Sequence, residues 1–70
     1  MTETWTNMSK AEAEALAADT AKSVIFATDM LHGFARPLRD GETEAQAVAE
    51  FEASGELCDY SRVFEPEDAE

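Results

Sequence analysis

A shortage of large apolar side chains constrains this chain more than any other feature. Only twelve of its 70 residues are Leu, Ile, Val or Phe, whereas 16 acidic residues outnumber five basic ones, giving a formal net charge of -11. This composition is typical of disordered chains, and 70 residues is close to the smallest size at which one core offsets chain entropy. We therefore expect one small domain over residues 1–70, with an N-terminal extension at 1–8 and an acidic tail at 65–70. Strong helices or a second chain would have to stabilise it.

A capping box predicts the first helix. Ser9 and Glu12 have the spacing at which the hydroxyl and the carboxylate each bind the other's backbone amide. The stripe that follows at helical spacing consists of Ala13, Leu16, Thr20, Val24, Ala27 and Leu31. Gly33 is suited to the left-handed conformation that closes a helix, and Pro37 disfavours helix just beyond it. These signals predict a helix over residues 10–32.

The second half of the chain predicts two shorter helices. Thr43 and Gln46 form a second capping box, and Ser54-Gly55 ends the helix that it begins, which gives residues 44–53. A third short helix, over residues 57–64, is indicated by four residues at roughly helical spacing: Leu57, Tyr60, Val63 and Phe64.

These elements predict an all-α domain in which the long helix packs on the two shorter ones. Ile25 and Phe26 lie outside the stripe of the first helix, so they need cover from the second helix, the terminal segments or another molecule. The alternative is an α+β fold, because residues 2–6 are strand-like and alternate. In that alternative the two terminal segments form a small strand pair.

No pattern of catalytic, metal-binding or cofactor-binding residues emerges. Cys58 is the single thiol, and its acidic neighbours Glu56 and Asp59 oppose thiolate formation. Asp29 and His32 have a spacing that can offer two ligands to one ion, but a four-ligand site needs more donors. With three glycines in all, a phosphate-binding loop is not expected. We therefore expect a protein that is not an enzyme and holds no cofactor or metal.

The chain shows no signal for secretion or for membrane insertion. It begins without the basic and apolar regions of a signal peptide, and its longest apolar run, residues 24–27, is too short to span a bilayer. A single cysteine excludes an internal disulfide. These features predict a cytoplasmic protein without a membrane partner.

The acidic charge is concentrated in the second half of the chain. Residues 1–35 carry a net charge of -3 and residues 36–70 a net charge of -8, and no basic residue occurs from 40 to 61. Direct nucleic-acid binding is not expected, because phosphate contact needs basic residues, whereas a basic protein surface would be attracted. An aromatic side chain can add a hot spot to such an interface. The predicted partner-binding residues are Glu42, Glu44, Glu50, Glu52, Glu56, Asp59 and Trp5.

This acidic half resembles a class of known inhibitors. The stretch from Asp40 to Asp59, DGETEAQAVAEFEASGELCD, and the ending EPEDAE are similar in character to small acidic proteins encoded by bacteriophages, including anti-CRISPR proteins and DNA mimics. Those proteins share no motif or fold, so no functional residue is carried over. The resemblance implies an inhibitor that occupies a basic, nucleic-acid-binding groove of a complex in the host cytoplasm. The alternative is a small helical accessory subunit or homodimer whose acidity serves solubility or adaptation to high salt.

Overall fold

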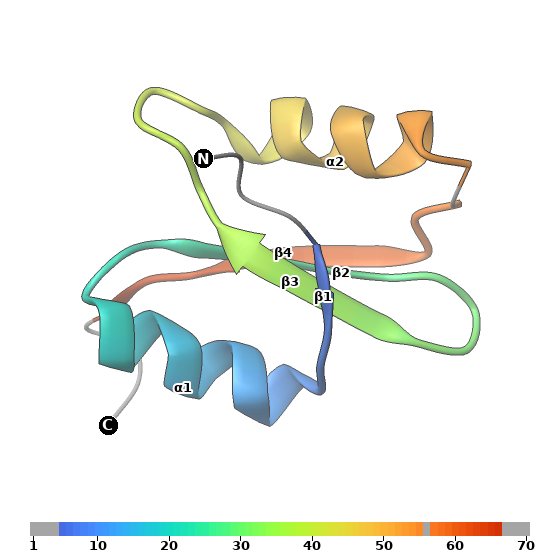
Figure 1. Ribbon diagram of the computed structural model, residues 1–70. Helices are drawn as coiled ribbons and strands as arrows, with labels where there is room; N and C mark the ends of the chain where they lie inside the picture. The colour runs from blue at the N-terminus through green and yellow to red at the C-terminus, as the bar shows by residue number, and fades with distance from the viewer. Residues whose placement is uncertain (1–4, 56, 67–70) are drawn as a thin grey trace.

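One antiparallel sheet lies between two helices (Figure 1). The computed structural model describes residues 5–55 and 57–66. Along the chain the elements are β1 (Thr6–Asn7), α1 (Lys10–Thr20), β2 (Val24–Thr28), β3 (Gly33–Pro37), α2 (Glu44–Ala53) and β4 (Tyr60–Phe64). The strand order is β1-β3-β2-β4, with α1 on one face and α2 on the other. The domain is therefore α+β, and the prediction of an all-α fold is wrong.

The central position of β2 explains why residues 24–27 are apolar throughout. Successive side chains of a strand point to opposite faces, and β2 has a helix on each face, so both sets must be apolar. Ile25 stands opposite Arg36 of β3 and Val63 of β4, and these three side chains share the face toward α2. Phe26 points to the other face, toward α1. Ile25 and Phe26 fell outside the helical stripe because they belong to a strand.

Small side chains let α1 lie close to the sheet. Ala13 and Ala17, one turn apart, have no exposed surface. The buried cluster beneath α1 consists of Ala13, Ala17, Val24, Phe26, Ala35 and Phe64, with Met8 and Leu16 packed against it. On the opposite face, the ring of Phe51 from α2 lies 5.7 Å from the ring of Phe34 and 4.9 Å from that of Trp5, centroid to centroid.

The helix predicted over residues 10–32 is correct at its start and wrong beyond Thr20. The capping box is confirmed, since the Glu12 amide donates to Ser9 Oγ at 3.1 Å and the Ser9 amide donates to Glu12 Oε1 at 2.8 Å. The helix ends at Thr20, and the capping residue after it, Ala21, adopts the left-handed conformation with φ 55° and ψ 35°. The β-branched and aromatic residues beyond this point fit a pleated sheet better than a helix.

Gly33 permits a close approach between chain segments and does not end a helix. It begins β3, and its carbonyl oxygen accepts from the Met8 amide at 2.9 Å and from Asn7 Nδ2 at 3.1 Å. A Cβ atom at this position would lie 2.6 Å from the Met8 carbonyl oxygen and 2.9 Å from the Phe26 ring. The segment after β1 can therefore lie against β3 only because residue 33 has no side chain.

The C-terminal segment is a strand, so the helix predicted over residues 57–64 is wrong. Tyr60 to Phe64 form β4, which pairs antiparallel with β2. The alternative prediction named the right class but the wrong pairing, because β1 pairs with β3 and β4 with β2, at opposite edges of the sheet. Residues 2–4 of that predicted strand lie outside the described residues. The helix at 44–53 and its capping box are confirmed.

Candidate functional site

A fully buried arginine lies beneath α2. Arg36 of β3 has no exposed surface, and its guanidinium donates two hydrogen bonds to the Glu42 carboxylate, Nη1 to Oε1 and Nη2 to Oε2, each 2.7 Å long. Glu50 Oε2 lies 3.3 Å from Arg36 Nε, and the ring centroid of Trp5 lies 5.0 Å from Cζ. Such bidentate pairing compensates for much of the cost of removing a guanidinium from water. The charge of Arg36 is neutralised inside the domain.

Arg39 extends this pairing toward the surface. Its Nη1 donates to Glu50 Oε1 at 2.7 Å and to Glu42 Oε2 at 3.1 Å, and its backbone amide donates to Glu42 Oε1 at 3.0 Å. The hydrogen bonds from Arg36 lower the pKa of Glu42 to about 2, and the hydrogen bond from Arg39 lowers the pKa of Glu50. We call Arg36, Arg39, Glu42 and Glu50 the ion cluster. Its two carboxylates are ionised and already paired with cations of this chain.

An open groove of about 640 Å³ runs between α2 and β4. Its lining consists of Thr43, Glu44, Ala45, Val48, Ala49, Glu52 and Ser61. Glu44 and Glu52 are eight positions apart on α2, which corresponds to about 12 Å along the helix axis. Ser61 Oγ donates to Glu44 Oε2 at 2.8 Å, and the Cys58 amide donates to Glu52 Oε2 at 3.4 Å. This acidic groove therefore combines an apolar wall with two carboxylates held at separate positions.

The seven predicted partner-binding residues fall into three groups. Glu44, Glu52 and Asp59 are exposed, Glu42, Glu50 and Trp5 belong to or contact the ion cluster, and Glu56 lies outside the described residues. The structure thus brings two of the seven, Glu44 and Glu52, onto the acidic groove.

Sequence reasoning missed the ion cluster because Arg36 falls between the helices predicted at residues 10–32 and 44–53 and not in a predicted strand. The sequence contained only a weak indication that Arg36 and Glu42 pair. Arg36 and Glu42 flank a turn that contains a proline and a glycine, and such a turn can bring two flanking side chains together. Trp5, predicted as a partner-binding residue, is half-buried against Phe51 and Arg36.

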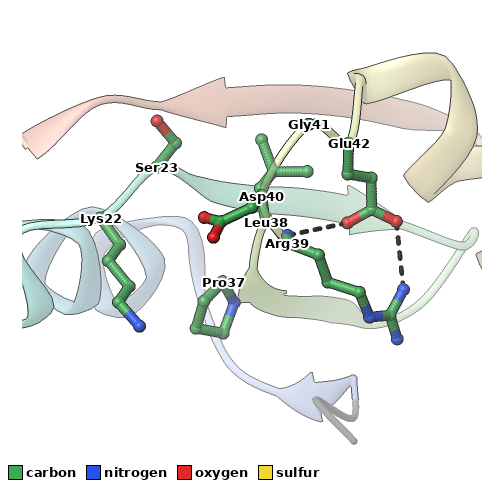
Figure 2. Close-up of a pocket in the computed structure, with 8 residues that line it drawn as sticks. All are labelled: Lys22, Ser23, Pro37, Leu38, Arg39, Asp40, Gly41 and Glu42. Carbon is green, nitrogen blue, oxygen red and sulfur yellow. Dashed lines mark hydrogen bonds and ion pairs between the residues drawn. The ribbon is translucent and has the colours of Figure 1, made fainter.

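A second hollow, of about 620 Å³, lies at the end of the sheet where β2 begins and β3 ends (Figure 2). Its lining consists of Lys22, Ser23, Pro37, Leu38, Arg39, Asp40, Gly41 and Glu42. Figure 2 shows the Glu42 carboxylate turned toward the backbone amide and the guanidinium of Arg39. Among these lining residues the single hydroxyl, that of Ser23, donates to Glu65. Mixed charges and an engaged hydroxyl make this hollow a poor candidate for catalysis or for binding a ligand of one charge.

The side chains considered for catalysis or metal binding lie in two different loops. Cys58 precedes β4, and burial raises the pKa of its thiol, as does the negative charge of Glu52. Asp29 and His32 belong to the β2–β3 turn, where Asp29 Oδ1 accepts from the backbone amides of Leu31 at 2.7 Å and His32 at 2.5 Å. In the part of the chain that the structure describes, no three His, Cys, Asp or Glu side chains are grouped as a metal site requires.

Comparison with known proteins identifies no relative. No protein-family model matches the sequence, and no curated protein and no solved structure is significantly similar to it. Neither helix in the described part of the chain has the length and apolar character that crossing a bilayer requires. Function must therefore be argued from the acidic groove, the ion cluster and the exposed side chains.

Proposed function

We propose that this protein is a non-enzymatic inhibitor that binds a basic protein surface and prevents nucleic acid from occupying it. One observation carries the proposal: two of the three arginines of the second half, Arg36 and Arg39, are paired with carboxylates of this chain, whereas the carboxylates of the acidic groove are exposed. The third, Arg62, is exposed but stands opposite Phe26 on the face toward α1, where its Cζ lies 4.9 Å from the centroid of the Phe64 ring. The face that carries the acidic groove therefore offers negative charge to a partner.

The chemistry of the acidic groove suits lysine or arginine side chains. The wall formed by Ala45, Val48 and Ala49 can contact their aliphatic stems, while Glu44 or Glu52 accepts hydrogen bonds from the charged ends. Two carboxylates about 12 Å apart along a helix axis can pair with two separate basic side chains of one surface.

The overall charge supports the same mode of action. A net charge of -11 accelerates encounter with a basic surface, and salt weakens the attraction. Small acidic phage-encoded inhibitors, which this sequence resembles in class, act in this way inside host cells. We therefore also propose a cytoplasmic site of action, on a nucleic-acid-handling complex of the host.

The test compares two double variants of equal net charge. Glu44→Lys/Glu52→Lys reverses the charge of the acidic groove, and Glu14→Lys/Asp19→Lys makes the same change on α1, across the sheet; both leave a net charge of -7. Glu12 is unsuitable as a control because its side chain caps α1. The immobilised proteins are exposed to a nuclease-treated lysate at about 50 mM salt, and bound proteins are then eluted with duplex DNA or with about 200 mM salt.

Wild type and the α1 variant should retain nucleic-acid-binding proteins that DNA displaces, whereas the groove variant should retain few of them. Circular dichroism and thermal unfolding establish that both variants fold. Retention of the same partners by the groove variant would contradict the proposal, and so would a set of partners that DNA cannot displace.

A homodimer is the second candidate, because β4 is an edge strand. Within residues 5–55 and 57–66 it pairs on one side only, with β2, so its other side can pair with another strand. Two copies joined through β4 would share one continuous sheet. Sedimentation equilibrium at low and high salt tests this directly, since salt screens the repulsion between acidic copies. A chain that remains monomeric under both conditions excludes this candidate.

A further inference from the structure

Three large apolar side chains are exposed together at one end of the sheet. Met30 and Leu31, in the β2–β3 turn, are 84% and 85% exposed, and Leu57, between α2 and β4, is 79% exposed. With Asp29 and Gly55 they line a shallow hollow of about 280 Å³. We call Met30, Leu31 and Leu57 the apolar tip.

The apolar tip is unusual in a chain so poor in apolar residues. It contains two of the four leucines and one of the three methionines, whereas alanines fill much of the core beneath α1. Single exposed apolar side chains are common on protein surfaces. A group of them around one hollow instead indicates a surface that is covered by another molecule.

Hydrogen bonds hold the apolar tip in place before any partner arrives. Asp29 Oδ1 accepts from the Leu31 amide at 2.7 Å and from the His32 amide at 2.5 Å, and the Asp29 amide donates to the His32 carbonyl oxygen at 3.0 Å. The Asp59 amide donates to the Thr28 carbonyl oxygen at 2.7 Å, which ties the loop after α2 to the base of the same turn. Such pre-organisation reduces the entropy lost on binding.

The charges around the apolar tip identify the kind of partner. Asp29 lines the hollow, the Glu52 carboxylate at the end of α2 accepts from the Cys58 amide beside Leu57, and the exposed Asp59 follows in the same loop. His32 is the one side chain of the β2–β3 turn that can carry positive charge. A second copy docked here would bring like charges together, whereas lysines or arginines would be attracted. The favoured partner is therefore a basic surface.

We propose that the apolar tip inserts into an apolar pocket bordered by lysine or arginine on the same partner that the acidic groove binds. This inference rests on the proposed function and assigns different roles in binding to the acidic groove and to the apolar tip. The carboxylates accelerate association, as charge complementarity generally does. The apolar tip slows dissociation, because buried apolar side chains must return to water when the complex separates.

The experiment uses two synthetic fluorescent peptides of equal positive charge, one alternating lysine with leucine and the other alternating lysine with serine. Fluorescence anisotropy at low salt measures their affinity for wild type, for Leu31→Ser/Leu57→Ser and for Glu44→Gln/Glu52→Gln. Leu38→Ser is the control for loss of an apolar side chain elsewhere, because it removes a half-buried leucine from the hollow of Figure 2 at the opposite end of the sheet.

Wild type should bind the lysine–leucine peptide at least about tenfold more tightly than the lysine–serine peptide. Leu31→Ser/Leu57→Ser should abolish that difference, should leave binding of the lysine–serine peptide unchanged, and should unfold at the wild-type temperature because both residues are exposed. Leu38→Ser should keep the difference. Glu44→Gln/Glu52→Gln should weaken binding of both peptides.

Equal affinity of the tip variant and wild type for the lysine–leucine peptide would overturn the inference while leaving the proposed function intact. Failure of wild type to bind either peptide would overturn both proposals. Self-association of wild type that Leu31→Ser/Leu57→Ser removes would show that the tip binds a second copy, and would likewise overturn the inference.

Discussion

Replacing Glu42 with glutamine should destabilise the fold by about 3 kcal/mol, because breaking one side of a buried ion pair costs about 3–5 kcal/mol. Glu42 accepts from both terminal nitrogens of Arg36 at 2.7 Å. A glutamine keeps one acceptor oxygen and turns an NH₂ group toward the guanidinium. Glu50, whose Oε2 lies 3.3 Å from Arg36 Nε, preserves part of the compensation, so the lower end of the range is expected.

This loss is large for a chain of 70 residues, whose total stability is about 4–10 kcal/mol. The midpoint of thermal unfolding should fall by about 12–24 °C. Urea unfolding gives the free energy, followed by circular dichroism and by the fluorescence of Trp5, whose ring centroid lies 5.0 Å from Arg36 Cζ. Glu44→Gln makes the same chemical change at an exposed glutamate in the first turn of α2 and should cost less than about 1 kcal/mol.

The pH dependence of stability tests the same interaction independently. Hydrogen bonds from Arg36 lower the pKa of Glu42 from its ordinary value of 4.5 to about 2. Because the pKa is lower in the folded state, the stabilisation is complete above pH 4.5 and is lost as the pH falls toward 2. At about 1.4 kcal/mol for each pKa unit, the loss is about 3 kcal/mol. A cost of Glu42→Gln below about 1 kcal/mol, or an unchanged acid dependence in that variant, would refute the reasoning.

Three further predictions concern the cap of α1, the close approach at Gly33 and the thiol of Cys58. Ser9→Ala should cost about 1 kcal/mol in urea unfolding through loss of the cap of α1, and an unchanged midpoint would contradict that role. Gly33→Ala should cost about 1–3 kcal/mol, because its Cβ would lie 2.6 Å from the Met8 carbonyl oxygen and 2.9 Å from the Phe26 ring; a variant as stable as wild type would exclude the close approach. Cys58 should react with iodoacetamide more slowly in the folded protein than in urea, because burial raises its pKa, and equal rates would argue against burial.

Helix starts were predictable because capping is local. Both capping boxes use residues three positions apart, so the sequence alone contains the whole interaction. The end of α1 was not predictable from periodicity, because the stripe at helical spacing continues past Ala21 into β2. The apolar run at residues 24–27 was the better signal, because a strand that is covered on both faces is apolar at successive positions.

The strands depend on partners that are distant in sequence. Phe26 of β2 stands opposite Ala35 and also opposite Arg62 of β4, so its conformation is decided by residues far along the chain. The apolar tip could not be predicted for the same reason, because its residues come from two loops that are far apart in sequence. Leu31 was assigned to the buried stripe of a helix and Leu57 to a third helix, yet both lie in loops and are exposed. Charge composition indicated the acidic half, but only the fold separates paired carboxylates from exposed ones.

The ion cluster connects the fold to the proposed binding surface. The buried residues of α2 are Ala47 and Phe51, so apolar packing alone gives this helix few contacts with the sheet. Arg36 on β3 is hydrogen-bonded to Glu42 in the loop before α2, and the Glu42 carboxylate also accepts from Arg39. Arg39 in turn donates to Glu50 on α2 at 2.7 Å, so directional contacts join the sheet to the helix. Ion pairs of this kind constrain orientation more than apolar contacts do, even where they add little net stability. The cluster therefore fixes the position of α2 on the sheet, and with it the carboxylates of the acidic groove, although its own carboxylates are already paired.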